Sequence, residues 1–173
     1  MRRNTLALVS AGLLWVAAPV YATTDPWDKT DRRLGFGLEV GDPTGLSAKY
    51  YLSSRLALEG GLGFFGWPWG SGGHLDLLYE FPEVIRTSGE SFSLPLFVGG
   101  GFKGGGYVFC NVNNATHCDV DSFVGVRVPL GIAMQFKNSP LEMQFEVAPG
   151  VYAPFRYGWG GEADASFAIR YYF

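Results

Sequence analysis

Residues 163–173 read ADASFAIRYYF, and the alternation of side chains in this stretch decides the fold class. One face of the extended chain carries only apolar side chains, the large ones being those of Phe167, Ile169, Tyr171 and Phe173. Asp164 and Arg170 occupy the opposite face. Successive side chains of a β-strand point to opposite faces, so a period of two predicts a strand. The stretch ends on an aromatic residue without a polar tail, which indicates an apolar environment rather than water.

Seven earlier stretches repeat this period of two. They are residues 33–40, 46–52, 56–65, 74–81, 92–103, 123–136 and 141–151. With residues 163–173 they make eight predicted strands, and single-chain membrane barrels of bacteria have an even number of strands.

The charged residues of these stretches all lie on the face opposite the apolar one. Besides Arg33 at the start of the first stretch, they are Glu39, Lys49, Glu59, Asp76, Glu80, Lys103, Arg127, Glu142, Glu146, Asp164 and Arg170. A soluble barrel would place polar residues outside, whereas the narrow interior of eight strands accommodates glycine and scattered charges. The apolar face must then point outward into lipid. The predicted fold is all-β, an eight-stranded antiparallel up-and-down transmembrane β-barrel.

Composition agrees with this architecture. Charged residues make up 17% of the chain and there are 25 glycines, against about 25% charged residues and ~7% glycine in ordinary soluble domains. After the first apolar run, no second run of helix-spanning length follows, which excludes helical membrane spans and leaves a barrel.

The amino-terminal residues predict export. Two arginines, a short apolar run and small residues at Val20 and Ala22 are typical of a cleaved secretory signal over residues 1–22. Residues 23–32 would form a short lead, and residues 33–173 the barrel. Removal of Arg2 and Arg3 changes the net charge from −3 to −5. This balance argues against a nucleic-acid partner, because such domains usually carry a basic face.

With these alternating strands and a terminal aromatic residue, the chain resembles the small OmpA/OmpX-like outer-membrane barrels. Residues 34–64, and GDPTGLSAKYYLS over 41–53 in particular, resemble the opening of an uncharacterised bacterial family of such barrels. The resemblance implies an outer-membrane location and contact with outer-membrane lipid and lipopolysaccharide. It also implies that the outer-membrane assembly machinery reads the apolar pattern of Phe167, Ile169, Tyr171 and Phe173.

Three prolines fall inside the predicted strands, and each lacks a backbone N–H donor. We expect Pro95 and Pro149 to lie near strand ends. Pro129 falls in mid-strand and predicts either a bulge or a misplaced strand boundary.

Connections between strands suggest the topology. The odd ones are residues 41–45, 66–73, 105–122 and 152–162, which we place outside the cell, and the even ones are placed in the periplasm, although residues 82–91 make the second of these longer than a typical periplasmic turn. Cys110 and Cys118, the only cysteines, lie in the longest predicted loop, and in an exported protein this pair predicts a disulfide. A metal site with His117 and Asp119 is a second interpretation, although this set is not a standard zinc site.

Aromatic residues cluster at the predicted outer rim. Trp67, Trp69, Tyr157 and Trp159 are typical of anchors at the membrane interface, and they could also form a surface contact for a ligand.

Three functions follow from these features. The first is a non-enzymatic outer-membrane barrel with surface-exposed loops, serving envelope integrity or contact with a surface ligand or host, and it needs no cofactor. The second is a lipid A modifying enzyme that uses His74 with Asp76 and the nearby Ser71, although the sequence lacks a deacylase-like His-x-Ser strand. The third is a small pore, because acidic residues outnumber basic ones on the predicted lumenal face.

Overall fold

The protein is described by a computed structural model that covers residues 33–65, 70–81, 91–110, 118–154 and 158–173. The predicted signal over residues 1–22 and the lead over 23–32 lie outside the described residues. Within the described ranges, no helix is long and apolar enough to cross a membrane.

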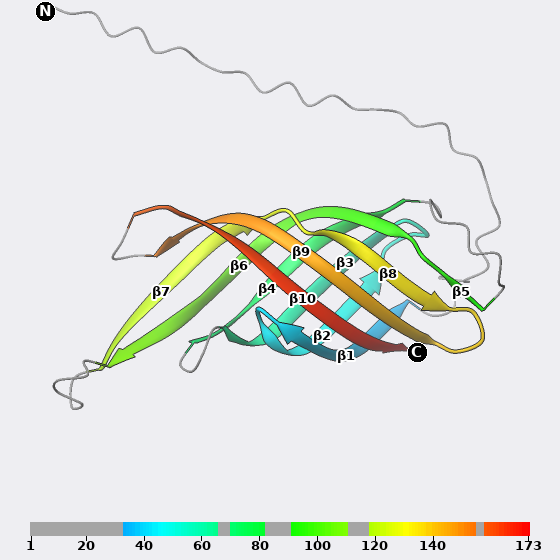
Figure 1. The fold of residues 1–173 in the computed structure, drawn as a ribbon, viewed down its shortest axis with the longest axis horizontal. Coiled ribbons are helices and arrows are strands. Elements are labelled where there is room, and N and C mark those ends of the chain that lie inside the picture. The colour runs from blue at the N-terminus through cyan, green and yellow to red at the C-terminus, as the bar shows by residue number, and fades with distance from the viewer. Residues whose placement is uncertain (1–32, 66–69, 82–90, 111–117, 155–157) are drawn as a thin grey trace, which may run out of the picture.

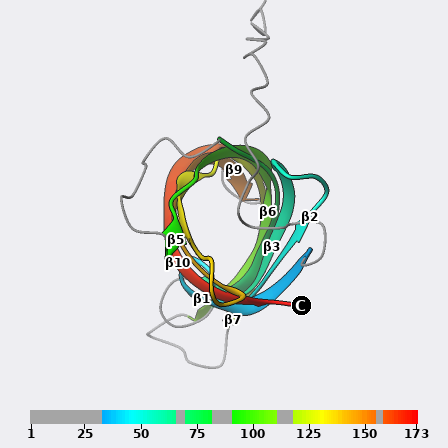
Figure 2. The same cartoon turned by 90° about the vertical axis from the view of Figure 1, so that its right-hand side faces the viewer.

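The described chain is a closed ring of antiparallel strands (Figures 1 and 2). The strands are β1 (Leu34–Gly41), β2 (Thr44–Tyr51), β3 (Leu56–Phe65), β4 (Gly70–Glu80), β5 (Phe92–Ser93), β6 (Leu96–Cys110), β7 (Cys118–Arg127), β8 (Leu130–Phe136), β9 (Leu141–Pro154) and β10 (Gly160–Tyr172). β5 with β6, and β7 with β8, each act as one strand, so the ring has eight strands, closed by pairing of β10 with β1. The predicted fold class is confirmed.

The register is unbroken across Pro95 and Pro129. β6 pairs with β7 through Gly101 opposite Arg127, and with β8 through Val98 opposite Leu130, so no residue is inserted at Pro129. The continuous register rules out a bulge at Pro129, whereas β7 ends at Arg127 and β8 begins at Leu130, so the other predicted outcome, a strand boundary there, is found. The Pro129 carbonyl accepts a hydrogen bond from the Gly99 amide at 2.8 Å, and the proline only removes the return donor.

Pro149 was expected near a strand end, and it lies instead inside β9, opposite Ala163 of β10. Its carbonyl accepts a hydrogen bond from the Val128 amide at 2.9 Å. The side chain of Pro149 is exposed on the outer surface. β9 therefore keeps its register with the neighbouring strands and lacks one hydrogen-bond donor toward Val128.

The strands extend further than the sequence predicted. β6 runs to Cys110 and β7 begins at Cys118, so most of the predicted loop over 105–122 is strand. The two cysteines stand at strand ends. Beyond Tyr107, which pairs with both Gly70 and Asp121, β6 and β7 continue as a two-stranded ribbon past the ring (Figure 1). Pairing holds glycines 104–106 in the ladder despite their low strand propensity.

We call the end of the barrel with this ribbon and the β1–β2 turn the loop end, and the end with the β2–β3 and β8–β9 turns the turn end. Apolar side chains cover the outer surface, as Leu38 at 64% exposure illustrates. Its neighbour Glu39, at 2% exposure, points into the lumen. Inside the turn end lies a small apolar core of Tyr51, Ala57, Leu78, Phe97 and Tyr172.

Candidate functional site

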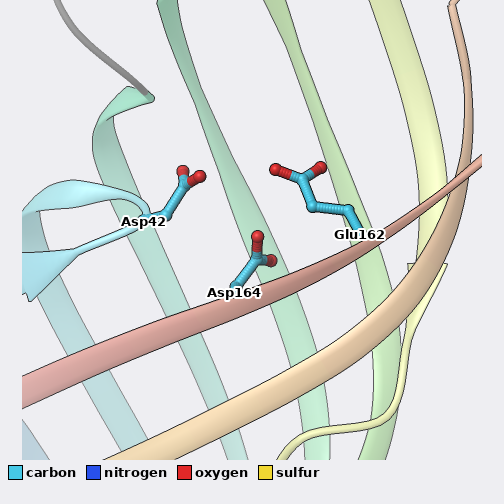
Figure 3. A group of neighbouring side chains, drawn as sticks. All are labelled: Asp42, Glu162 and Asp164. Atoms are coloured by element: carbon cyan, nitrogen blue, oxygen red, sulfur yellow. The ribbon is translucent and has the colours of Figure 1, made fainter.

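The most distinctive feature of the lumen is a series of charged side chains that begins at the loop end. Asp42, in the β1–β2 turn, and Glu162 and Asp164 of β10 point toward one another (Figure 3). The Lys103 ammonium nitrogen lies 2.7 Å from Asp164, 3.5 Å from Asp42 and 3.7 Å from Glu162. Lys103 therefore joins β6 to the turn and to β10.

This acidic group could in principle hold a metal ion, because the three carboxylates offer oxygen atoms within 4.8 Å of one another. The Lys103 ammonium already lies within ion-pair distance of all three. Burial raises the pKa of the Asp42 carboxyl above its ordinary value, although Lys103 favours its charged form. We interpret the group as an ion-pair cluster around a lysine and assign no metal to it.

Arg127 of β7 organises the next layer of the lumen. Its guanidinium contacts Glu146 of β9 and lies 3.3 Å from Asp164 and 3.4 Å from Asp76 of β4. The other oxygen of Asp76 lies 2.6 Å from Nδ1 of His74. A Cβ atom on Gly101 would overlap Asp76, so the absence of a side chain there makes room for this layer.

Arg170 of β10 is the centre of the third layer. It donates to Glu59 at 2.6 Å, to Glu142 at 3.2 Å and to the Ser47 hydroxyl at 2.8 Å. The amide nitrogen of Gln144 donates to both oxygens of Glu59 at 3.0 Å, and its oxygen accepts from Arg170 at 2.9 Å. All these groups are almost fully buried, so a missing partner would leave a charge unpaired in a dry interior.

The last layer lies at the turn end. The Lys49 ammonium donates to Glu80 at 2.7 Å, and the Tyr51 hydroxyl donates to the same oxygen at 2.7 Å. Tyr172 and Gln135 both donate to Glu142, at 3.0 Å each. Charged groups are thus linked continuously from the loop end to the turn end.

Aromatic rings flank the charged layers at both ends. At the loop end, Phe123 is stacked on Tyr107 with ring centroids 5.0 Å apart and meets Tyr152 edge-on at 6.0 Å. At the turn end, the Tyr51 and Tyr172 rings lie 5.7 Å apart. A cavity beside Lys103 and Arg127 measures about 10 Å³, room for about one water molecule. Around this cavity, the lumen-facing side chains of Lys103 and Arg127 are buried.

The structure places all eleven predicted lumenal charges inside this series, each at 6% exposure or less. The sequence placed Gln135 and Gln144 on the charged face without naming them as partners, and it missed Asp42, Ser47, Tyr51 and Glu162. Most of them share the alternation of the charged residues, as Tyr51 does with Lys49, and that signal could have found them. Asp42 stands in a turn, where alternation gives no direction.

Of the residues considered for catalysis, His74 and Asp76 come together but Ser71 does not join them. His74 is buried in the lumen, where both ring nitrogens face carboxylates, at 2.6 Å to Asp76 and 3.4 Å to Glu39. Ser71 is exposed. An odd separation along one strand places Ser71 and His74 on opposite faces of the barrel wall. The geometry gives no support to a catalytic pair of these two residues.

Backbone pairing sets Cys110 directly opposite Cys118. Gly99 and Pro129 form a hydrogen-bonded pair in the same register, so hydrogen-bonded positions on this side of β6 are odd-numbered. Cys110 therefore stands at a non-hydrogen-bonded position, where opposed Cα atoms are about 4.5 Å apart. His117, of the metal interpretation, lies outside the described residues.

Of the predicted surface-contact residues, Trp67, Trp69 and Tyr157 lie outside the described residues. Trp159, just before β10, is 77% exposed. Phe167, Ile169, Tyr171 and Phe173 are all exposed on the outer side of β10 and the residue that follows it.

No protein-family model matches the sequence, and no curated protein matches it significantly. Among solved structures, the chain is similar to the N-terminal β-barrel domain of OprF from Pseudomonas aeruginosa, with a TM-score of 0.57. The match covers 82% of this chain and 96% of that domain. The chain has the OprF barrel fold. The predicted resemblance to small OmpA-like barrels is confirmed at the level of fold. Because OprF and this chain are 19% identical, the comparison shows a common fold and says nothing about the lumenal residues.

Proposed function

We propose that the chain is a closed, non-enzymatic outer-membrane β-barrel that holds its loop end at the cell surface, for envelope integrity or for contact with a surface ligand. The observation that carries this proposal is the packed lumen, in which four charged layers lie between aromatic rings. A barrel closed in this way has no path for solutes and stabilises the membrane region as a rigid support. The apolar outer surface and the OprF-like fold support lipid and lipopolysaccharide as its surroundings.

Planar-bilayer recording tests the closed lumen. We expect no steady ion currents from the purified protein. The double variant Glu142→Ala and Arg170→Ala removes one acidic and one basic side chain from the third charged layer of the lumen. It keeps the net charge and should produce measurable currents. Steady unitary currents from the unaltered protein would favour the small-pore function instead.

Labelling of intact cells tests the orientation. Trp159→Cys places a thiol at the loop end, and Asn138→Cys places one in the exposed β8–β9 turn. A membrane-impermeant maleimide should label the first in intact cells and the second only after permeabilisation. The opposite pattern would reverse the barrel. Unchanged lipid A masses after incubation with purified lipopolysaccharide would count against the enzymatic alternative.

We further propose that Cys110 and Cys118 form a disulfide that clamps the ribbon. Their opposed, non-hydrogen-bonded positions support it, because disulfides need Cα atoms roughly 4.4–6.8 Å apart. Alkylation without reductant should leave both thiols unlabelled. Reduction should leave the barrel folded, since ring pairing does not depend on this bridge. Trp67, Trp69, Tyr157 and Trp159 are then the proposed contacts for interfacial lipid or a surface ligand.

A further inference from the structure

His74 makes a contact that the ring of strands does not require. Its Nδ1 atom lies 2.6 Å from Asp76 Oδ2 on its own strand, β4. Its Nε2 atom lies 3.4 Å from Glu39 Oε2 on β1. β1 and β4 are separated in the ring by β2 and β3, so the imidazole connects non-neighbouring strands through the lumen.

A neutral imidazole cannot satisfy both contacts, because one of its nitrogens carries a lone pair and would face a carboxylate. An imidazolium donates from both nitrogens and carries the opposite charge to both partners. We propose that His74 is a proton-dependent clasp, which holds β1 to β4 across the lumen while it is doubly protonated and releases Glu39 when it loses a proton.

Gly61 of β3 gives the clasp its space. A Cβ atom at Gly61 would overlap His74 Nε2 and lie 2.7 Å from Glu39 Oε2. Its neighbour Gly60 points outward, where a Cβ would meet its nearest atom at 3.3 Å. β3, one of the two strands between the partners, therefore carries no side chain at Gly61, where one would block the contact.

Charges on the surrounding strands decide how the clasp responds to pH. Lys103 of β6 lies opposite His74, Glu59 of β3 lies opposite Asp76, and Arg127 of β7 contacts Asp76. From the remaining strands, Glu146 of β9 and Arg170 of β10 also face this region. Loss of a proton leaves one ring nitrogen with a lone pair that faces a carboxylate, so a rise in pH weakens the Glu39 contact. Stability from the clasp is present at neutral pH and is lost as His74 deprotonates.

The test uses the full chain in detergent micelles with ¹⁵N-labelled histidine. The sequence has two histidines, so His117→Gln leaves His74 as the only histidine signal. At neutral pH both ring nitrogens should give imidazolium shifts. A neutral imidazole there, with the proton on Glu39 instead, would overturn the proposal.

Two further variants separate the clasp from general packing. Gly61→Ala should lower the pH at which the His74 signal changes form, whereas Gly60→Ala should leave that pH unchanged. His74→Gln keeps a hydrogen-bonding side chain without the charge. The ratio of the unfolding equilibrium constant of the unaltered protein to that of His74→Gln should rise about tenfold from neutral to alkaline pH. Parallel pH profiles for the two chains would also overturn the proposal.

Discussion

At the scale of single residues, the lumen depends on charges that have several partners each. Arg170 is 1% exposed and binds side chains from β2, β3 and β9. Removing one member of such a network leaves its partners buried without compensation, which costs more than the loss of the contact alone.

Arg170→Gln should therefore lower the free energy of unfolding by about 3–5 kcal/mol. Arg55→Gln, in the β2–β3 turn, changes the same charge at a partly exposed site and should cost under about 1 kcal/mol. Urea unfolding in lipid vesicles, followed by tryptophan fluorescence, measures both. Equal losses would show that the network adds nothing to the stability of the barrel.

The alternation of residues predicted which charges are inside, because Leu38 and Glu39 must point to opposite faces. It could not predict their partners. Gln144 contacts Glu59 and Arg170, and these three residues lie on three different strands. The shift of these strands along the barrel axis decides the contact, and no local sequence pattern predicts that shift. The same limit explains why the sequence predicted Asp76, on the same strand, as a partner of His74 but not Glu39, on β1.

At the scale of strands, depth in the membrane should govern the cost of charge on the outer surface. Val128 and Leu52 are both 49% exposed, but Val128 lies in the middle of its strand and Leu52 lies at the turn end. Val128→Arg should cost about 2–4 kcal/mol, and Leu52→Arg about 0–1 kcal/mol. Equilibrium unfolding in vesicles measures the difference, and equal costs would contradict the outward facing of the apolar surface.

Pro149 offers a second test at this scale. It accepts a hydrogen bond from Val128 but cannot return one. Because its side chain is exposed, Pro149→Val restores the donor without disturbing the lumen, and it should stabilise the barrel by about 0.5–1.5 kcal/mol. Pro149→Val with unchanged or lower stability would mean that the strand is strained when fully paired.

Strand ends were the least predictable feature of the fold. Glycines 104–106 read locally as loop, yet β4 and β7 pair with them on both sides. Pro95 lies between β5 and β6, near a strand end as predicted, whereas Pro149 lies inside β9. A ring held by neighbouring strands keeps its register at a position that lacks one donor.

At the scale of the whole molecule, closure joins β10 to β1. The Phe173 amide donates to the Leu34 carbonyl at 3.0 Å, while the Phe173 side chain is 68% exposed on the outside. Burial of one Phe in lipid is worth only about 1.5–3 kcal/mol, so its loss should leave the folded barrel intact at equilibrium.

If the assembly machinery reads this residue, as we propose, Phe173→Ser should reduce the amount of protein in the outer membrane while the purified variant refolds normally in detergent. Tyr172→Phe, which keeps the ring inside the lumen, is the matched control for a change at the neighbouring position. Membrane fractionation with immunoblotting measures the effect. Unchanged outer-membrane levels for Phe173→Ser would remove Phe173 from the proposed signal.

The ribbon of β6 and β7 extends past the ring. In the proposed orientation, it therefore keeps a molecule that binds at its tip at a minimum distance from the bilayer. Three paired positions beyond Tyr107, at about 3.4 Å each, form a stalk about 10 Å long. A stalk with two hydrogen-bonded strands resists bending more than a single chain would. Antibodies raised against residues 111–117 should therefore reach the native protein on cells, and their access should fall as the surface sugar layer becomes thicker than the stalk.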